Sequence, residues 1–331
     1  MKNQTTNNLP QPTTNLRIAK THLDEFGYCL VADALSDDTV ARLRTRLEEQ
    51  AIAEKQRGFA FEDGGATQNW GDFRKPDGSL RPEAFTEEHG GRNQRIWMLI
   101  NKGVVFHHLL FHERIRELIS YRLGDEFLLS SHTANIAKPG GVAMDLHTDQ
   151  WWMPAPTRRD RSPLPPGSIN RRRFDVDKAW PPAMIAPAVV VNVLWMLSGF
   201  TAENGGTRVV PRSHLIGRQP DADRDTDVET VAAEGRAGTA LVLDGRTWHG
   251  TGANVTDAPR WAVISTFCGP QFRPQENFTV GTSSEVLKQA SPELLALLGF
   301  KVWNAYGRIE SPAVEFISPS ETSLGEMQPE P

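Results

Sequence analysis

Two histidines and one aspartate have the types and spacing of a metal site. His147 and Asp149 are separated by one residue, and His249 follows far downstream. Residues i and i+2 of a β-strand point to the same side of a sheet, so His147 and Asp149 can face one interior. Two imidazoles and one carboxylate can occupy one face of an octahedron and leave the other face open for O2 chemistry. The spacing therefore predicts a mononuclear iron site.

The surroundings of His249 strengthen this prediction. A His-x-Asp pair alone is more often just a pair of polar residues at a strand end. His249, however, comes after an Asp244-Gly245 turn and an apolar segment. A third ligand on a neighbouring strand would have this context.

Arg260 lies downstream of His249 and begins the apolar segment 261–265. If this segment runs antiparallel to the strand that carries His249, Arg260 brings a permanently charged planar group close to the metal. Such a group suits bidentate capture of a carboxylate. Thr251 points to the same side as His249 and could add a hydroxyl. The simpler alternative for Arg260 is a solvated arginine at the start of a strand.

The segments that must position these residues have β-type patterns. Seven short runs are separated mostly by turn residues, which is typical of a double-sheet barrel or jelly roll. The runs are 127–137, 141–148, 188–197, 207–211, 239–243, 247–252 and 261–268. We therefore expect a mainly β fold, a double-stranded β-helix (jelly roll, cupin-like) core with flanking N-terminal and C-terminal helices.

The flanking helices are predicted from capping residues and apolar spacing. Ser36 is a candidate N-cap for a helix that ends near Gly58. A second helix is expected over 104–123, ending at Gly124, and two short helices over 283–298, split at Ser291-Pro292. The segment 64–91 has no usable period and is expected to be a loop.

Composition favours a single enzyme-sized domain over 16–317, with a jelly-roll core at about 127–268 and disordered tails at 1–15 and 318–331. The chain has 331 residues, of which 39% are hydrophobic, so it can bury a sizeable core. A net charge of -5 argues against nucleic acid as a partner. No apolar run is long enough to span a membrane. Two cysteines in apolar surroundings, Cys29 and Cys268, fit a reducing cytoplasm. The sequence makes no prediction of the oligomeric state.

A long loop, about 150–187, directly follows the first two predicted ligands. Loops of this length in a compact domain are usually functional, so we expect a substrate lid. Its candidate substrate residues are Trp151, Trp152, Met153, Arg158 and Arg159. A variable surface loop with solvated charges is the alternative.

Taken together, four further motifs resemble one enzyme family. They are Asp24-Glu25-Phe26-Gly27-Tyr28, Glu203-Asn204-Gly205-Gly206, Pro211-Arg212-Ser213-His214 and Trp248-His249-Gly250-Thr251-Gly252-Ala253-Asn254 with Arg260. The chain is similar to the Fe(II)- and 2-oxoglutarate-dependent dioxygenases, in the phytanoyl-CoA dioxygenase-like branch. The resemblance covers most of the chain.

The resemblance implies specific roles for the residues that match by position. His147, Asp149 and His249 would bind iron, and Arg260, with Thr251 beside it, would hold the distal carboxylate of 2-oxoglutarate. Trp195 matches a position that lines the cosubstrate pocket, and Asn192 and Asn135 are weaker candidates there. His214 is expected to have a structural role.

The implied reaction uses Fe(II), 2-oxoglutarate and O2, releases succinate and CO2, and hydroxylates a C–H bond of a small organic molecule. Family members that halogenate lack the carboxylate ligand, so Asp149 favours oxygen insertion, although desaturation or cyclisation stays open. Two other classes also stay open. One is a cupin-like metalloenzyme, a hydrolase or isomerase, that uses the same triad without 2-oxoglutarate, and the other is a noncatalytic jelly-roll binding protein. A metal site at His107, His108 and His112 is disfavoured because histidines on an apolar helix are more often packed or surface groups.

Overall fold

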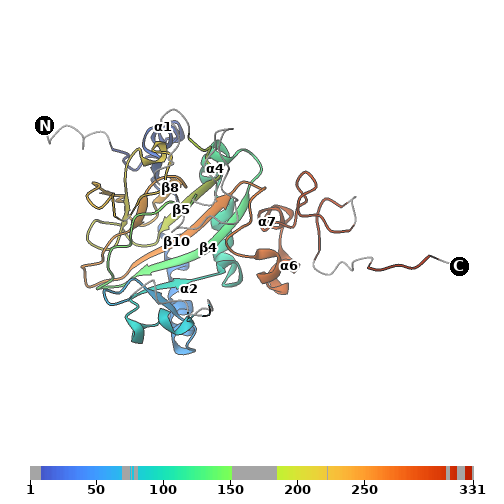
Figure 1. Cartoon of the computed structure of the whole chain (residues 1–331), viewed down its shortest axis with the longest axis horizontal. Helices are drawn as coiled ribbons and strands as arrows, with labels where there is room; N and C mark the ends of the chain where they lie inside the picture. Colours follow the sequence, from blue (N-terminus) through green and yellow to red (C-terminus); the bar gives the residue numbers. More distant parts are fainter. Residues whose placement is uncertain are drawn as a thin grey trace.

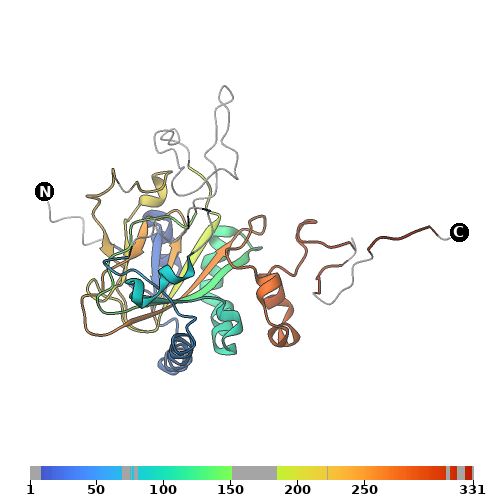
Figure 2. The ribbon, with the colours of Figure 1, turned by 60° about the horizontal axis from the view of Figure 1, so that its bottom comes forward.

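The architecture is a β core with helices packed around it. The computed structural model describes residues 9–68, 75, 77, 81–150, 185–221, 223–310, 314–318 and 325–329. Two antiparallel sheets form the core, and α2, α4, α6 and α7 lie at its periphery (Figures 1 and 2). The predicted mainly β jelly-roll fold with flanking helices is confirmed.

The major sheet has seven strands in the order β1-β8-β5-β10-β4-β3-β2, and all of its neighbouring strands are antiparallel. Its strands are β1 (Tyr28–Val31), β2 (Phe61–Asp63), β3 (Asn93–Ile96), β4 (Leu128–Ala137), β5 (Val190–Met196), β8 (Ala240–Asp244) and β10 (Arg260–Cys268). The first three come from the N-terminal third of the chain and widen the sheet beyond the predicted core.

The minor sheet has the order β7-β6-β9. Its strands are β6 (Thr207–Val209), β7 (Val231–Ala232) and β9 (His249–Thr251). The predicted strand over 141–148 is wrong as a regular strand. This segment instead contacts β9 at separate positions. His147 and His249 form an isolated antiparallel bridge, and the N–H of Met144 donates to Thr251 O at 2.9 Å.

The helix predicted to begin after Ser36 is confirmed, and a further helix with a side-chain cap precedes it. α1 (Leu16–Phe26) is capped by Asn15, and α2 (Asp37–Gln56) by the side chain of Ser36. Part of the predicted N-terminal tail also contacts the fold, since Thr13 forms a parallel bridge with Val31 of β1. Residues 9–15 therefore do not behave as a free tail.

The single helix predicted over 104–123 is wrong, because the chain breaks at His112. It forms α3 (Val104–His107), a 3-10 turn (His108–Phe111) and α4 (Glu113–Leu123). The ring of His112 caps α4 by accepting from Ile115 N, and its Nε2 bonds Ala34 O at 2.8 Å. A polar side chain bonded to nearby backbone competes with helix continuation, which the apolar spacing alone does not reveal.

The C-terminal helices are α5 (Phe278–Gly281), α6 (Ser284–Gln289) and α7 (Pro292–Leu297). The predicted split at Ser291-Pro292 is confirmed, with Ser291 as the N-cap of α7. Short 3-10 helices occupy Pro82–Phe85, Glu87–His89, Leu99–Asn101 and Ser213–Leu215.

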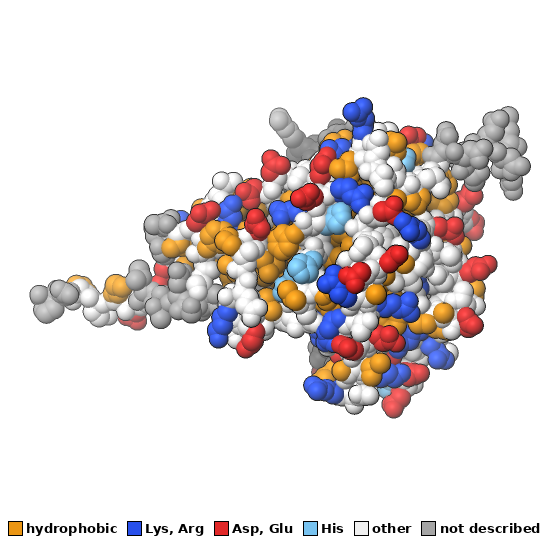
Figure 3. All heavy atoms as spheres, turned by 180° about the vertical axis from the view of Figure 1, so that it is seen from behind, with side chains coloured by type: hydrophobic (Ala, Val, Ile, Leu, Met, Phe, Trp, Pro, Cys, Tyr) orange, Lys and Arg blue, Asp and Glu red, His pale blue; other side chains and the backbone are white. Residues whose placement is uncertain are grey.

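On the face opposite to that of Figure 1, acidic and basic side chains are interspersed (Figure 3). No helix among the described residues has the length and apolar character needed to cross a membrane.

Side-chain alternation along β5 decides what each face of the major sheet contacts. Val191, Val193 and Trp195 belong to the large core cluster that also holds residues of the helices. Asn192 and Leu194 point the other way and line a cavity inside the barrel. The sheet thus separates a dry core, on the helix side, from a partly polar interior.

Candidate metal centre and cosubstrate cavity

The three predicted ligands converge in space. One ligand atom each from His147, Asp149 and His249 lies within 4.8 Å of the others. The Nε2 atom of His147 is 3.8 Å from Oδ1 of Asp149, and that of His249 is 3.4 Å from Oδ2. Among the described residues this is the only such group of histidine, cysteine and acidic side chains.

Backbone carbonyls orient both imidazoles. Nδ1 of His147 bonds the carbonyl of Asp145 at 3.0 Å, and Nδ1 of His249 bonds the carbonyl of Thr247 at 2.9 Å. A carbonyl can only accept, so each Nδ1 carries the proton and each Nε2 keeps a lone pair for a metal. Such bonds fix the tautomer and ring orientation of metal-ligating histidines.

Asp149 is held from β5 and from the turn before β9. Nδ2 of Asn192 donates to Oδ2 of Asp149 at 2.6 Å. The backbone N–H of Asp149 donates to Gly245 O at 3.0 Å. A donor on the carboxylate favours its anionic form, which is the form that binds a metal.

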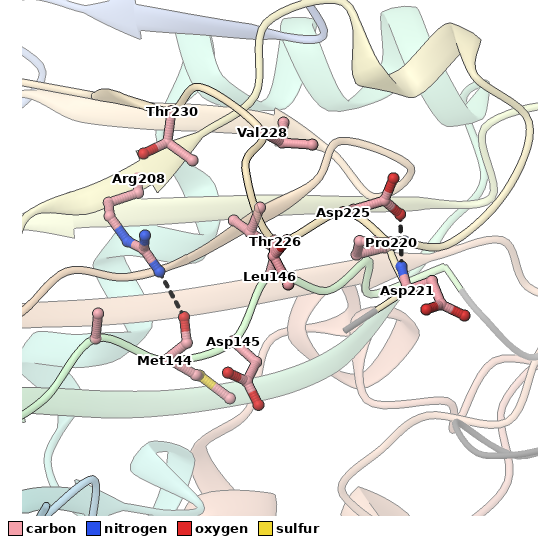
Figure 4. Close-up of a pocket in the computed structure, with 11 residues that line it drawn as sticks. Met144, Asp145, Leu146, Arg208, Pro220, Asp221, Asp225, Thr226, Val228 and Thr230 are labelled. Carbon is pink, nitrogen blue, oxygen red and sulfur yellow. Dashed lines mark hydrogen bonds between the residues drawn. The ribbon is translucent and has the colours of Figure 1, made fainter. Parts of the chain in front are cut away.

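The segment that leads to His147 is fixed from its outer side as well. Nη2 of Arg208, on β6, donates to the carbonyl of Met144 at 2.7 Å (Figure 4). This contact faces a second cavity, of about 320 Å³, whose far wall includes Asp221 and Asp225. Met144 lines both this cavity and the one that contains the triad.

Arg260 is buried at the start of β10 and is 2% exposed. Its Nε and Nη2 donate to Gly205 O at 3.0 and 2.9 Å, and its Nη1 donates to Asn135 O at 3.2 Å. No carboxylate of the described residues pairs with it. Burial, and secondarily the charge of Arg95, lowers the pKa of Arg260 to about 9. The solvated arginine considered from the sequence is thereby excluded.

The Asn-Gly-Gly motif explains how Arg260 is seated. Gly205, whose carbonyl accepts twice from Arg260, has a φ of +82°. A Cβ at this position would also lie 2.9 Å from the Cβ of Ala137. Glycine is required here for both reasons, and the turn positions one carbonyl to hold the guanidinium.

A cavity of about 270 Å³ joins the triad to both sheets. Of the predicted cosubstrate residues, Thr251, Asn192 and Asn135 line it. Oδ1 of Asn135 is buried without a hydrogen-bond partner, which is unusual for a buried polar atom unless a ligand or water completes it.

The placement of Trp195 contradicts its assignment to the cosubstrate pocket. Its ring packs 5.6 Å from that of His112, and its Nε1 donates to Ser265 Oγ at 3.2 Å on the helix side of the sheet. Trp195 lies three residues from Asn192 on one strand, so the two side chains point to opposite faces. Because Asn192 and Trp195 lie an odd number of positions apart, the sequence already indicated that the two side chains cannot line the same pocket.

Two charged residues of the cavity wall were missed by the sequence reasoning. Arg95 of β3 lines the cavity and forms a short salt bridge with Asp63 of β2, which is 1% exposed. Neither strand was predicted, because both are only three or four residues long. Arg95 also contacts Met144 Sδ at 3.8 Å.

Two sequence-based judgements on other histidines are supported. Nε2 of His214 bonds the carbonyl of Asp24 at 3.0 Å, which ties the Pro-x-Ser-His turn to α1. His107 and His112 bond backbone carbonyls and belong to no described metal cluster. The proposed substrate residues Trp151, Trp152, Met153, Arg158 and Arg159, and most of the predicted lid, lie outside the described residues.

Proteins named as dioxygenases are similar in sequence to this chain. The family model for phytanoyl-CoA dioxygenase (PhyH) matches residues 23–262. Dioxygenase af480 of Aspergillus fumigatus is 28% identical over 288 residues, which cover 86% of this chain and 77% of that protein. Dioxygenase sphC, also of Aspergillus fumigatus, is 26% identical over 283 residues, covering 85% and 66%.

Solved structures share the fold at low identity. The 2-oxoglutarate-dependent (alpha ketoglutarate) carbocyclase SnoK of nogalamycin biosynthesis is 19% identical, with a TM-score of 0.55 over 86% of this chain and 94% of that one. HygX from Streptomyces hygroscopicus, solved with nickel and 2-oxoglutarate, is 15% identical, with a TM-score of 0.52 over 78% and 89%. The match to the family model over most of the chain shows that this protein belongs to the phytanoyl-CoA dioxygenase (PhyH) family of non-haem Fe(II)- and 2-oxoglutarate-dependent dioxygenases.

Proposed function

We propose that this dioxygenase hydroxylates an unactivated C–H bond of a small organic molecule, with His147, Asp149 and His249 as the iron ligands. The observation that carries the proposal is the complete triad at the wall of a cavity. Two neutral imidazoles and one anionic carboxylate on one side leave the cavity side for 2-oxoglutarate, O2 and substrate.

The distances fit an iron ion without rearrangement of the backbone. Metal–ligand bonds of about 2.1 Å place neighbouring ligand atoms of an octahedron roughly 3 Å apart. The separations of 3.8 and 3.4 Å between the imidazole nitrogens and the carboxylate oxygens are slightly larger. Small side-chain rotations would close them.

Arg260 and Thr251 are proposed to hold the distal carboxylate of 2-oxoglutarate. A guanidinium that is buried without a carboxylate partner in the described part of the chain carries a desolvation cost that an anionic ligand would offset. Thr251 and Asn135 lie at the cavity wall, and Asn135 is hydrogen-bonded to Arg260 through its backbone carbonyl. The charge balance therefore favours a dicarboxylate with one end near Arg260 and the other near the metal.

When bound, iron together with 2-oxoglutarate and O2 supplies the oxidant that hydroxylates the substrate, with release of succinate and CO2. The chain itself contributes orientation and charge. The carbonyls of Asp145 and Thr247 hold the N–H at Nδ1 of each ring, which directs Nε2 toward the metal, and the bond from Asn192 orients the carboxylate of Asp149. Because Asp149 fills the carboxylate position, oxygen insertion is favoured over halogenation.

Family membership decides against the two alternatives considered from the sequence, a metalloenzyme without 2-oxoglutarate and a noncatalytic binding protein. The proposal is tested by succinate formation from anaerobically purified protein given Fe(II), 2-oxoglutarate, ascorbate and O2, with a metabolite library. Library members that increase succinate identify substrates, and mass spectrometry of their products should show a gain of one oxygen atom.

The controls separate a wrong reaction from a missing substrate. His147→Ala should form no more succinate than a protein-free mixture, because one iron ligand is lost. Products that have lost two hydrogens instead of gaining oxygen would replace hydroxylation by desaturation or cyclisation. Wild-type protein that binds neither Fe(II) nor 2-oxoglutarate in titrations would contradict the site assignment.

A further inference from the structure

The part of the cavity on the β2–β3 side is aromatic. Phe61 of β2 and Trp97, just after β3, line the same cavity as the triad, and their ring centroids lie 5.9 Å apart, edge to face. Phe61 also stacks on Phe85 at 4.3 Å. Trp97 keeps 44% of its surface exposed. Phe61 and Trp97, which line the cavity, form what we call the aromatic wall.

The polar groups that share this cavity carry no net charge. Ser131 and Thr133 of β4, Thr266 of β10 and Gln275 contribute hydroxyls and an amide. Outside the metal triad, the charged side chains among the described lining residues are Arg95 and Asp63, and these pair with each other. To pair with Arg95, an anionic ligand group would have to displace the buried carboxylate of Asp63. To pair with Asp63, a cationic group would have to displace Arg95.

One buried carboxylate bonds the backbone next to Trp97 and next to Ser131. Glu276 is 7% exposed and accepts from the backbone N–H of Met98 at 2.6 Å and of His132 at 2.7 Å. These two residues and Glu276 itself each follow a cavity-lining residue, namely Trp97, Ser131 and Gln275. Met98 also adopts a left-handed conformation with a φ of 53°. A surface fixed by such contacts loses little conformational entropy when a ligand binds.

We propose that the substrate is an uncharged ring compound whose apolar ring lies against Phe61 and Trp97 and whose hydroxyl or carbonyl groups meet Ser131, Thr133 and Gln275. This inference rests on the proposed function, because it places the substrate in the same cavity as the metal. An exposed tryptophan offers a flat apolar face for such a ring. Hydroxyl and amide side chains offer both donors and acceptors, which suits neutral oxygen groups.

The proposal can be tested without turnover, on metal-free protein, with 2-naphthol and 2-naphthoate as matched probes at pH 7.5. They share one ring system and differ in that the naphthoate is an anion. Affinities are measured by saturation-transfer NMR and by calorimetry. We expect 2-naphthol to bind at least about tenfold more tightly than 2-naphthoate. Among the described lining residues beside Phe61 and Trp97 the anion meets no unpaired cation, and Arg260, proposed above for 2-oxoglutarate, is not itself one of the lining residues.

Variants of the wall locate the binding. Trp97→Ala and Phe61→Leu should each weaken 2-naphthol binding by about five- to tenfold, as expected when an aromatic contact is lost. Tyr121→Ala is the control, since Tyr121 is equally exposed, at 45%, but lies on α4 outside the cavity. Circular dichroism melts show whether each variant is folded, and Trp97→Leu replaces Trp97→Ala if the alanine variant is not.

Three results would overturn the proposal. They are 2-naphthoate binding as tightly as 2-naphthol, no binding of either probe to the wild-type protein, and unchanged 2-naphthol affinity in both folded wall variants. Because the metal-free protein is used, these results are independent of iron and 2-oxoglutarate. Normal succinate formation together with a negative probe result would reject the substrate class alone, whereas positive probe binding by a protein that neither forms succinate nor binds 2-oxoglutarate would reject the reaction alone.

Discussion

Replacement of Arg260 by methionine should abolish tight 2-oxoglutarate binding while leaving the ligand-free protein folded. Methionine has a similar length but no charge and no donors. In the folded protein, burial depresses the pKa of Arg260 from 12.5 to about 9. At about 1.4 kcal/mol per pKa unit, the buried guanidinium costs about 5 kcal/mol relative to water.

Two opposing effects set the stability of the Arg260→Met protein. Removal of the charge relieves the cost of about 5 kcal/mol. Removal of the donors leaves the carbonyls of Gly205 and Asn135 without these bonds, at about 1–3 kcal/mol each. Because these sums are similar, the melting temperature of the ligand-free variant should lie within a few degrees of the wild type.

For the affinity for 2-oxoglutarate, no gain offsets the loss of the Arg260 charge. Removal of one partner from a buried charge pair costs about 2–5 kcal/mol of affinity. This corresponds to a loss of roughly 30-fold to several thousand-fold in the Kd of 2-oxoglutarate. Anaerobic calorimetry with Ni(II)-loaded protein measures the Kd, and thermal melts with and without 2-oxoglutarate check it independently, since a bound ligand raises the melting temperature.

A matched control and a competing variant make the result decisive. Arg46→Met removes a guanidinium that also donates to a backbone carbonyl, that of Lys102, but on α2 away from the cavity. It should keep the wild-type Kd. If Arg260→Met binds 2-oxoglutarate within threefold of wild type, the assignment of Arg260 is refuted, and a large loss in Arg95→Met would then place the distal carboxylate at β3.

Three further predictions concern the site and the core. Asn192→Ala removes the donor to Asp149 and should weaken metal binding about 10- to 100-fold in a Co(II) titration; unchanged affinity would show that this contact is dispensable. Trp195→Phe should cost about 1–2 kcal/mol of unfolding free energy through the lost bond to Ser265, yet leave the Kd of 2-oxoglutarate within threefold, whereas a tenfold loss would return Trp195 to the cosubstrate pocket. Burial raises the pKa of Glu276 from 4.5 to about 7, so the folded state binds more protons than the unfolded state in this window, and the stabilising contribution of Glu276 is lost as the pH rises from 4.5 through 7. Relative to wild type, Glu276→Gln should therefore gain about 3 kcal/mol of stability across that window in urea unfolding of metal-free protein, and a pH-independent difference would contradict the raised pKa.

Local patterns predicted the elements whose signals lie within a few residues. Ser36 caps α2 and Ser291 caps α7 because a serine oxygen satisfies free N–H groups at the start of a helix wherever the helix is placed. The jelly-roll core followed from alternating apolar runs and glycine turns. Segment 141–148 failed as a strand because it contacts β9 only at isolated positions.

The structure added what depends on distant parts of the chain. The short strands β2 and β3 have no pattern long enough to identify, yet they carry Asp63, Arg95 and Phe61 to the cavity. His112, at the break, caps α4 with its ring and also bonds Ala34, which is 78 residues away in the sequence. Glu276 likewise acts on Met98 and His132, both more than a hundred residues before it.

The sequence alone indicated the kind of chemistry, because the types and order of His147, Asp149 and His249 restrict which ion can bind. The tertiary structure decided which residues surround that ion. In the paired strands, the side chain of Trp195 lies in the core and Arg260 is buried beside the carbonyl of Gly205. The aromatic wall lies at the cavity. These outcomes depend on register and burial, which arise only when segments far apart in the chain pack together.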